Sequence, residues 1–320
     1  MYFKFRLLAC FVLFNFCARA QKPLMYYTDI TSGKPIAKDP YVVYYQNRYL
    51  MYYSIPGANN GPWNIGIAQS NNLTDWIKVG EIKPTENYEA KGICAPGCTV
   101  KDGKLHLFYQ TYGNGKDDAI CHAVSDDGLN FIKDTSNPVF KPSATWSCGR
   151  AIDAEVVLFK NHYFMYFATR DSSYKIQEQG VAVADSKSDF SRMSWKLLST
   201  AGPILKPEFT WETRCTEGAS CIRRGNYLYM FYAGGYNNDP QQIGVARSKD
   251  GLIWQKISDK PFLTNGMSGS WNESESGHPD IFKDKSGRYF LFFQGNNTKG
   301  NSWYLSKVAV KWSANGPSLQ

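Results

Sequence analysis

Four ionisable residues occupy matching places in the sequence, each at the start of an apolar segment that precedes a polar turn. Three are carboxylates and one is a histidine: Asp39, Asp153, Glu217 and His278. Carboxyl groups that meet at one place repel each other, which raises the pKa of at least one of them and suits it to acid/base chemistry. One protonated and one ionised carboxyl are what hydrolysis of a glycosidic bond requires. The pattern therefore predicts a carboxylate site assembled from separate segments.

The elements that would position these residues are five copies of one phrase, a polar turn followed by alternating aromatic and aliphatic residues. The copies recur about every sixty residues, the scale of a structural repeat. Each turn follows another apolar segment, as in a β-hairpin. A second phrase then predicts a third strand, a turn and a fourth strand that begins with an aromatic residue. In the fifth copy we expect that aromatic residue to be Trp312. The turns begin at Asn47, Gly103, Asn161, Gly225 and Gly287.

Four strands repeated five times predict an all-β protein, a five-bladed β-propeller with four-stranded antiparallel blades around a central channel. One such sheet cannot bury both of its faces alone, whereas blades stacked around an axis can. No long window shows the 3.6-residue period of a helix, so an α/β barrel is not favoured. The innermost strand of each blade is the one before the hairpin turn. The four ionisable residues would therefore meet at one end of the channel.

Residues 1–20 are expected to lie outside this fold. Lys4 and Arg6 precede a short apolar run, and Ala18-Arg19-Ala20 is a small-x-small pattern, as in a cleaved secretory signal peptide. The run is too short to span a bilayer, and no later stretch is apolar enough. We expect residues 21–320 to form one propeller domain that is secreted or periplasmic, monomeric and without a membrane span.

Composition and cysteine content limit the other classes of function. The formal net charge is +8, and without a basic stripe this does not indicate nucleic-acid binding. Anchoring as a lipoprotein through Cys17 is not favoured, because the residues before it are not small. The spacing of cysteines and of the four histidines fits no zinc motif, so we expect no metal site. Six cysteines of the mature chain allow disulfides, and one near Glu217 would stiffen its strand: Cys94, Cys98, Cys121, Cys148, Cys215 and Cys221.

Together these motifs resemble glycoside hydrolase family 43, five-bladed propellers that act on arabinan, xylan and related side chains. Asp39-Pro40 resembles the general base of that family, and Glu217-Gly218 resembles its general acid. Ile152-Asp153 resembles the carboxylate that holds and tunes the acid. Gly277-His278 resembles the histidine that approaches the channel centre, often near a bound ion or water.

The resemblance implies an inverting, exo-acting glycoside hydrolase that requires no cofactor. Asp39 would deprotonate a water molecule, Glu217 would protonate the departing sugar oxygen, and Asp153 would keep Glu217 protonated. The released sugar would be L-arabinofuranose or D-xylose, from plant-type polysaccharide side chains or oligosaccharides. Galactofuranosidase or galactosidase activity is the alternative within hydrolysis.

Aromatic residues six or seven positions before the inner strands are candidates for substrate binding. Sugar rings pack their apolar faces on aromatic planes, and these loops are expected at the mouth of the pocket. Packing between blades is the equally favoured alternative for them. The candidates are Trp146, Trp211, Trp271 and Tyr88, with His278 as a further substrate-binding residue.

Two functions besides hydrolysis stay open. Phosphorolysis would need basic residues that hold phosphate, and a non-catalytic propeller would only bind glycans. The second predicts a damaged acid or base, whereas both are present. The basic candidates are Arg150, Arg170, Arg214 and His278.

Three further acids need an interpretation. Glu155 lies two residues beyond Asp153, on the same face of a strand, and is an alternative tuning carboxylate or a partner for an arginine. Glu212 and Glu275 precede inner strands, and we expect both to be solvated loop residues.

Overall fold

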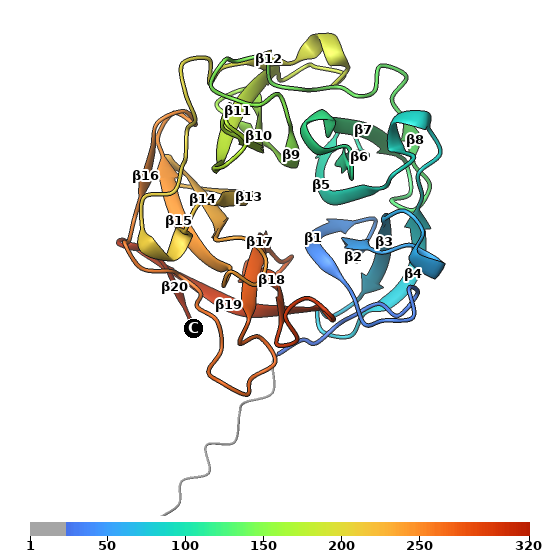
Figure 1. Ribbon diagram of the computed structural model, residues 1–320, viewed down its shortest axis with the longest axis vertical. Helices are drawn as coiled ribbons and strands as arrows, with labels where there is room; N and C mark the ends of the chain where they lie inside the picture. The colour runs from blue at the N-terminus through green and yellow to red at the C-terminus, as the bar shows by residue number, and fades with distance from the viewer. Residues whose placement is uncertain (1–23) are drawn as a thin grey trace, which may run out of the picture.

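The computed structural model describes residues 24–320, which form five four-stranded antiparallel sheets around a central axis (Figure 1). The predicted all-β, five-bladed propeller is confirmed. The predicted signal peptide, residues 1–20, and the lipoprotein alternative at Cys17 lie outside the described residues. Within 24–320, no helix is long and apolar enough to cross a membrane.

The strands of each blade follow chain order from the axis outward (Figure 1). Blade one holds β1 (Lys38–Tyr45), β2 (Arg48–Ile55), β3 (Asn64–Ser70) and β4 (Ile77–Ile82). Blade two holds β5 (Ile93–Lys101), β6 (Lys104–Thr111), β7 (Ile120–Ser125) and β8 (Ile132–Lys133). Blade three holds β9 (Ile152–Phe159), β10 (His162–Arg170), β11 (Gln177–Asp185) and β12 (Lys196–Leu197). Blade four holds β13 (Thr216–Arg224), β14 (Tyr227–Gly234), β15 (Gln242–Ser248) and β16 (Trp254–Lys256). Blade five holds β17 (Glu275–Lys283), β18 (Tyr289–Asn296), β19 (Tyr304–Ser313) and β20 (Gly316–Leu319).

The polar turns form hairpins, as predicted. Gln46 and Asn47 join β1 to β2 with φ of 48° and 65°, and Lys160 and Asn161 join β9 to β10 with 47° and 64°. Two consecutive positive φ angles suit the twist of a two-residue hairpin. The prediction for the last strand was wrong, because Trp312 lies inside β19 and the fourth strand of blade five is β20.

The aromatic excess of the sequence packs between blades. The buried hydrophobic residues form five clusters, each joining residues of two neighbouring blades. Stacking of blades thus buries both faces of each sheet, as the repeat pattern requires. The ring is closed by the segment before β1, where Tyr27 pairs antiparallel with Leu305 of β19.

Buried carboxylates tie the loops to these seams, which corrects one expectation. Glu212 and Glu275 were expected to be solvated, yet both are fully buried. Glu212 accepts a hydrogen bond from the Tyr232 hydroxyl at 2.7 Å and pairs with Lys256 Nζ at 2.8 Å. Glu275 accepts hydrogen bonds from side-chain amides, including that of Gln294. These partners offset the cost of removing each charge from water.

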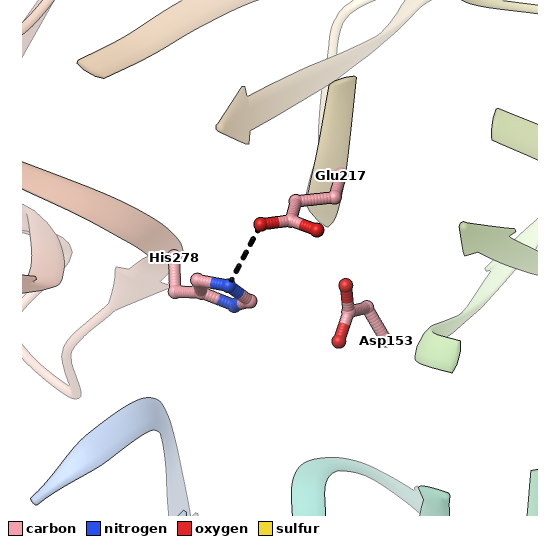
Figure 2. A group of neighbouring side chains, drawn as sticks. All are labelled: Asp153, Glu217 and His278. Atoms are coloured by element: carbon pink, nitrogen blue, oxygen red, sulfur yellow. Dashed lines mark ion pairs between the residues drawn. The ribbon is translucent and has the colours of Figure 1, made fainter. Parts of the chain in front are cut away.

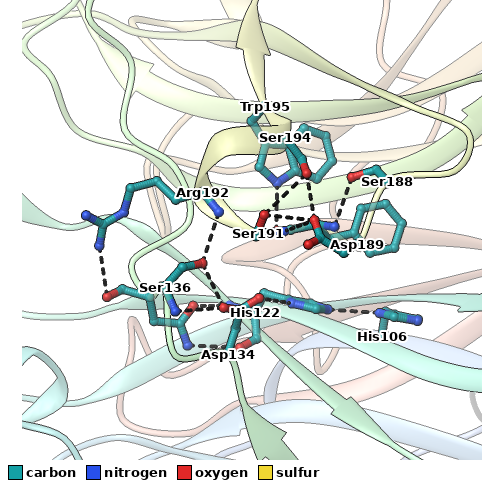
Figure 3. A network of polar contacts seen from close by, with 12 residues as sticks. His106, His122, Asp134, Ser136, Ser188, Asp189, Ser191, Arg192, Ser194 and Trp195 are labelled. Carbon is teal, nitrogen blue, oxygen red and sulfur yellow. Dashed lines mark hydrogen bonds and ion pairs between the residues drawn. The ribbon is translucent and has the colours of Figure 1, made fainter.

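A polar network joins the outer parts of blades two and three (Figure 3). His122 Nδ1 lies 3.0 Å from Asp134 Oδ2, and His122 Nε2 lies 2.9 Å from His106 Nδ1. Arg192 completes the connection, because its backbone N–H donates to the Ser136 hydroxyl at 3.0 Å. The network fixes one seam far from the channel.

No disulfide joins the cysteines of the described chain. All six that the sequence offered for disulfides are free thiols, and five of them are buried. The strand that carries Glu217 is therefore held by hydrogen bonds and packing. The six are Cys94, Cys98, Cys121, Cys148, Cys215 and Cys221.

Candidate active site

A β-bulge interrupts every inner strand at the same level of the channel. One residue at each bulge has a positive φ, a conformation that costs energy for any residue except glycine and that recurs at functional sites. A bulge also re-aims the side chain that it carries. The five residues, in blade order, are Asp39 (51°), Ala95 (47°), Asp153 (54°), Gly218 (57°) and His278 (42°).

Blade four departs from the predicted register. Glu217 was expected at the position equivalent to Asp39 and Asp153, but the equivalent residue is Gly218, and Glu217 precedes it by one. A Cβ atom at position 218 would lie 3.2 Å from His278 Nδ1. Glycine therefore suits both the positive φ and the space that the imidazole needs.

Polar side chains of the preceding blade hold two of the bulges in place. The Gln294 side-chain oxygen accepts a hydrogen bond from the Asp39 backbone N–H at 2.8 Å. The Gln110 side-chain oxygen accepts one from the Asp153 backbone N–H at 2.6 Å. Both glutamines lie on second strands, so each blade fixes a functional residue of the next. The carboxylates are thereby placed by rigid elements.

The four predicted residues do come together at the channel. His278 lies between two of the carboxylates, with Nδ1 3.2 Å from Asp39 Oδ1 and Nε2 3.3 Å from Glu217 Oε1. Figure 2 shows Asp153 facing Glu217 and His278, and one ligand atom of each of these three residues lies within 4.8 Å of the others. Asp153, Glu217 and His278 are all buried. Glu217 also accepts hydrogen bonds from the amides of Gln177 and Gln241.

The charges of the site shift the pKa values of its three buried ionisable groups in different directions. Burial opposes the charged form of His278, but Asp39 and Glu217 outweigh it and raise the pKa of His278 to about 10. Burial opposes the charged form of Glu217 too, yet its bond to the imidazolium lowers the pKa of Glu217. Within residues 24–320 no ion pair includes Asp153, and burial raises its pKa to about 7. These directions favour Asp153 over Glu217 as the carrier of the proton of this pair.

Two carboxylates and one imidazole are also a donor set for a metal ion. A histidine binds metal only as neutral imidazole, through a free nitrogen lone pair. Here both ring nitrogens of His278 face carboxylates, and the raised pKa keeps the ring protonated. The imidazolium itself supplies the positive charge that these carboxylates need.

A cavity of about 290 Å³ opens above these residues. Aromatic side chains around it come from the loops that join second and third strands. Lys38 Nζ lies 4.8 Å from the ring centroid of Trp303 and 6.0 Å from that of Trp63. An aromatic wall with a few polar groups is typical of a sugar-sized site. The aromatic residues that line the cavity are Trp63, Tyr112, Tyr236 and Trp303.

The tryptophans predicted to stack on substrate do not line this cavity. Trp146 donates a hydrogen bond to the Ser199 carbonyl at 2.7 Å. Trp211 stacks on Tyr232, and Trp271 packs against the seam between blades four and five. Tyr88 likewise packs against the seam between blades one and two. The contacts of Trp211, Trp271 and Tyr88 match the alternative of inter-blade packing.

Sequence reasoning missed Trp63 and Trp303. The available signal was the aromatic residue that each blade carries between its second and third strands, but these loops differ in length and sequence. The five residues, in blade order, are Trp63, Tyr112, Tyr174, Tyr236 and Trp303.

Glu155, the alternative tuning carboxylate, belongs to another part of the channel. Its Oε1 accepts a hydrogen bond from the Cys221 backbone N–H at 2.8 Å, which ties blade three to blade four. It lines a separate cavity together with Asp280 and Tyr41. Burial raises the pKa of Glu155 to about 8.

Fold and site together define a propeller glycoside hydrolase, in which carboxylates from different blades meet at one end of the channel. The profile described as Glycosyl hydrolases family 43 matches residues 32–316. The chain belongs to this family.

Solved structures share the fold at low sequence identity. A thermostable family-43 glycoside hydrolase has a TM-score of 0.72 and 21% identity over 92% of this chain and 96% of its own. An endo-1,4-β-xylanase from Bacteroides thetaiotaomicron has 0.69 and 21%, over 89% and 94%. An α-L-arabinofuranosidase from Lactobacillus brevis has 0.69 and 16%, over 93% and 94%.

Proposed function

We propose that the protein is an exported, exo-acting and inverting glycosidase that releases L-arabinofuranose or D-xylose from side chains of plant-type polysaccharides or oligosaccharides. The observation that carries the proposal is the placement of Asp39 and Glu217 at opposite nitrogens of His278. The imidazole ring separates the two carboxylates. Inverting hydrolysis needs such a separation, because a water molecule must fit between base and sugar.

In this proposal Asp39 is the general base. It takes a proton from a water molecule as the water oxygen attacks the anomeric carbon. The bond from that carbon to the leaving oxygen breaks, and Glu217 gives its proton to this oxygen. The imidazolium of His278 orients both carboxylates. The proposed reaction requires no cofactor.

Glu217 must hold a proton before it can act as the acid. The pKa directions favour Asp153, whose pKa is raised to about 7, as the carrier of that proton. The ligand atoms of Asp153 and Glu217 lie within 4.8 Å, so the pair can share one proton. We propose that a bound glycosidic oxygen, by accepting a hydrogen bond from Glu217, draws the proton to that residue.

Exo action is supported by the shape of the site. The cavity is confined to one end of the channel and is surrounded by loops of several blades. Such a pocket suits the terminal sugar of a chain better than its interior. The choice of arabinose or xylose rests on the similarity of this fold to an arabinofuranosidase and a xylanase. Export is proposed from the basic and apolar pattern of residues 1–20.

The test is a panel of chromogenic glycosides that includes furanosides and galactosides. Turnover of the arabinofuranoside or xyloside, with first product of inverted configuration by proton NMR, would support the proposal. Asp39→Asn should abolish this turnover without changing the circular dichroism spectrum. Turnover restricted to galactosides, retention of configuration, or dependence on added inorganic phosphate would each contradict it.

A further inference from the structure

Two arginines at the catalytic cavity are not neutralised by the described part of the chain. Arg170 lines the cavity, and Arg214 lies beside it at the surface. Within residues 24–320 no carboxylate oxygen is paired with either guanidinium, whereas the neighbouring Arg150 lies 3.4 Å from Asp118. A charged group beside a partly buried cavity normally has a partner. The partner of these two is therefore to be sought among ligands.

The Arg170 guanidinium is already fixed in one orientation. Its carbon lies 4.4 Å from the ring centroid of Tyr174 and 5.5 Å from that of Tyr236. Its Nε donates a hydrogen bond to the Gln177 side-chain oxygen at 3.3 Å, whereas no hydrogen bond of the described residues uses its two terminal nitrogens. An arginine held in this way loses little side-chain entropy when it binds an anion.

Arg214 adds a second positive charge to the same place. Its guanidinium carbon lies 5.5 Å from the ring centroid of Tyr236, the same ring that Arg170 contacts. Two guanidinium groups against one tyrosine repel each other. A ligand with negative charge would relieve that repulsion, and a neutral sugar would not.

The position of Arg170 relative to the acid is set by Gln177. The Gln177 side-chain oxygen accepts from Arg170 Nε, and its side-chain nitrogen donates to Glu217 Oε2. One amide therefore separates the arginine from the carboxyl that would protonate the leaving oxygen. A group bound by Arg170 would lie next to the bond that is cleaved, on the side of the leaving sugar.

We propose that the substrate carries a carboxylate next to the cleaved bond, as a uronic acid residue in the leaving part, and that Arg170 and Arg214 bind it. The planar fork of a guanidinium matches the two oxygens of a carboxylate. This inference rests on the proposed glycosidase function and narrows its substrate to acidic oligosaccharides. The terminal sugar that is released stays neutral.

The first experiment compares two matched substrates. Oligosaccharides with a neutral terminal sugar on a uronic acid residue are used as they are and after reduction of their carboxyl groups to alcohols. We expect kcat/KM for the acidic form to exceed that for the reduced form at least tenfold at low salt, with the ratio falling as sodium chloride is added. A ratio within twofold would overturn the inference, as would a stronger preference for sulfate esters of the reduced form.

The second experiment removes the charges one at a time. Arg170→Gln should lower the acidic-to-reduced ratio at least fivefold, and Arg214→Gln should lower it less, because Arg214 is exposed. Arg223→Gln is the matched control, since Arg223 is exposed at the opposite end of β13 from Glu217 and should keep the full ratio. A full ratio in Arg170→Gln would contradict the assignment.

Binding separates this inference from the proposed function. Glu217→Gln should turn over oligosaccharides about a thousandfold more slowly than the wild type, so affinities for the acidic and reduced forms can be measured on it by calorimetry. Tighter binding of the acidic form would uphold the inference even if the wild type cleaved neither substrate and the glycosidase proposal failed. Equal affinities would overturn the inference and leave hydrolysis to its own test.

Discussion

His278 Nδ1 lies 3.2 Å from Asp39 Oδ1, so an imidazolium from blade five is paired with the proposed base from blade one. Its other nitrogen faces Glu217, at 3.3 Å. One buried cation thus organises both carboxylates of the proposed reaction. A group of this kind positions the residues that do the chemistry and sets their protonation.

Replacement of His278 should therefore change both rate and pH dependence. In His278→Asn the loss of the imidazolium should lower kcat by about a hundredfold and raise the pKa of Glu217, which His278 now lowers. The alkaline limb of the kcat/KM profile should then move to higher pH, because Glu217 must be protonated to act as the acid. A lower kcat with an unchanged profile would mean that His278 only fills space.

Removal of Asp153 should have the opposite effect on the alkaline side. Activity in the wild type should fall as pH rises through about 7, where the Asp153–Glu217 pair loses its shared proton. In Asp153→Asn the proton must reside on Glu217 alone, whose pKa is low. The alkaline limb should then shift to lower pH. An unshifted limb in the purified variant would refute the shared proton.

The aromatic residues of the cavity should affect binding more than stability. Trp303→Ala should raise KM roughly tenfold, since a lost aromatic contact costs about 1 kcal/mol or more. Trp211 provides the comparison, because it stacks on Tyr232 outside the cavity. Trp211→Ala should lower the melting temperature and leave KM near its wild-type value. A raised KM in Trp211→Ala and an unchanged KM in Trp303→Ala would indicate instead that the substrate stacks on the loops that precede the inner strands.

The repeats of the sequence predict the fold and most positions of the site. The repeats predict the propeller because hairpin turns and buried aromatics are local patterns that recur in each blade. The same repeats place Asp39, Asp153 and His278 correctly, because all three occupy the bulge. Glu217 lies one residue before the bulge position at which it was predicted. A bulge is a feature of the backbone, and no residue type is specific to it. Trp63 and Trp303 were missed because the loops that carry them vary.

The sequence predicts that one carboxyl of the site has a raised pKa, but it does not show which one. The protonation depends on which carboxylate contacts His278, and that follows from distances between blades. Glu212 and Glu275 illustrate the same limit: their burial depends on partners, such as Tyr232 and Gln294, that are distant in sequence. Spacing alone marked both as solvated.

A buried carboxyl outside the catalytic cavity, that of Glu155, should control stability at high pH. The pKa of Glu155 is raised from 4.5 to about 8 by burial, so the folded state holds a proton that the unfolded state releases. Stability should fall as pH rises from about 5 to 8. Glu155→Gln should remove on the order of 2 kcal/mol of this loss, measured by thermal unfolding at pH 5 and pH 9. Glu208→Gln, at an exposed site, is the control; equal pH dependence in both variants would contradict the account.

The most direct test of the central claim compares leaving groups in Glu217→Gln. A sugar hydroxyl needs a proton to depart, whereas 2,4-dinitrophenolate does not. We expect kcat/KM to fall by about a thousandfold on an oligosaccharide but much less on the dinitrophenyl glycoside of the same sugar. Equal losses on both substrates, or full activity on the oligosaccharide, would contradict the assignment of Glu217 as the acid.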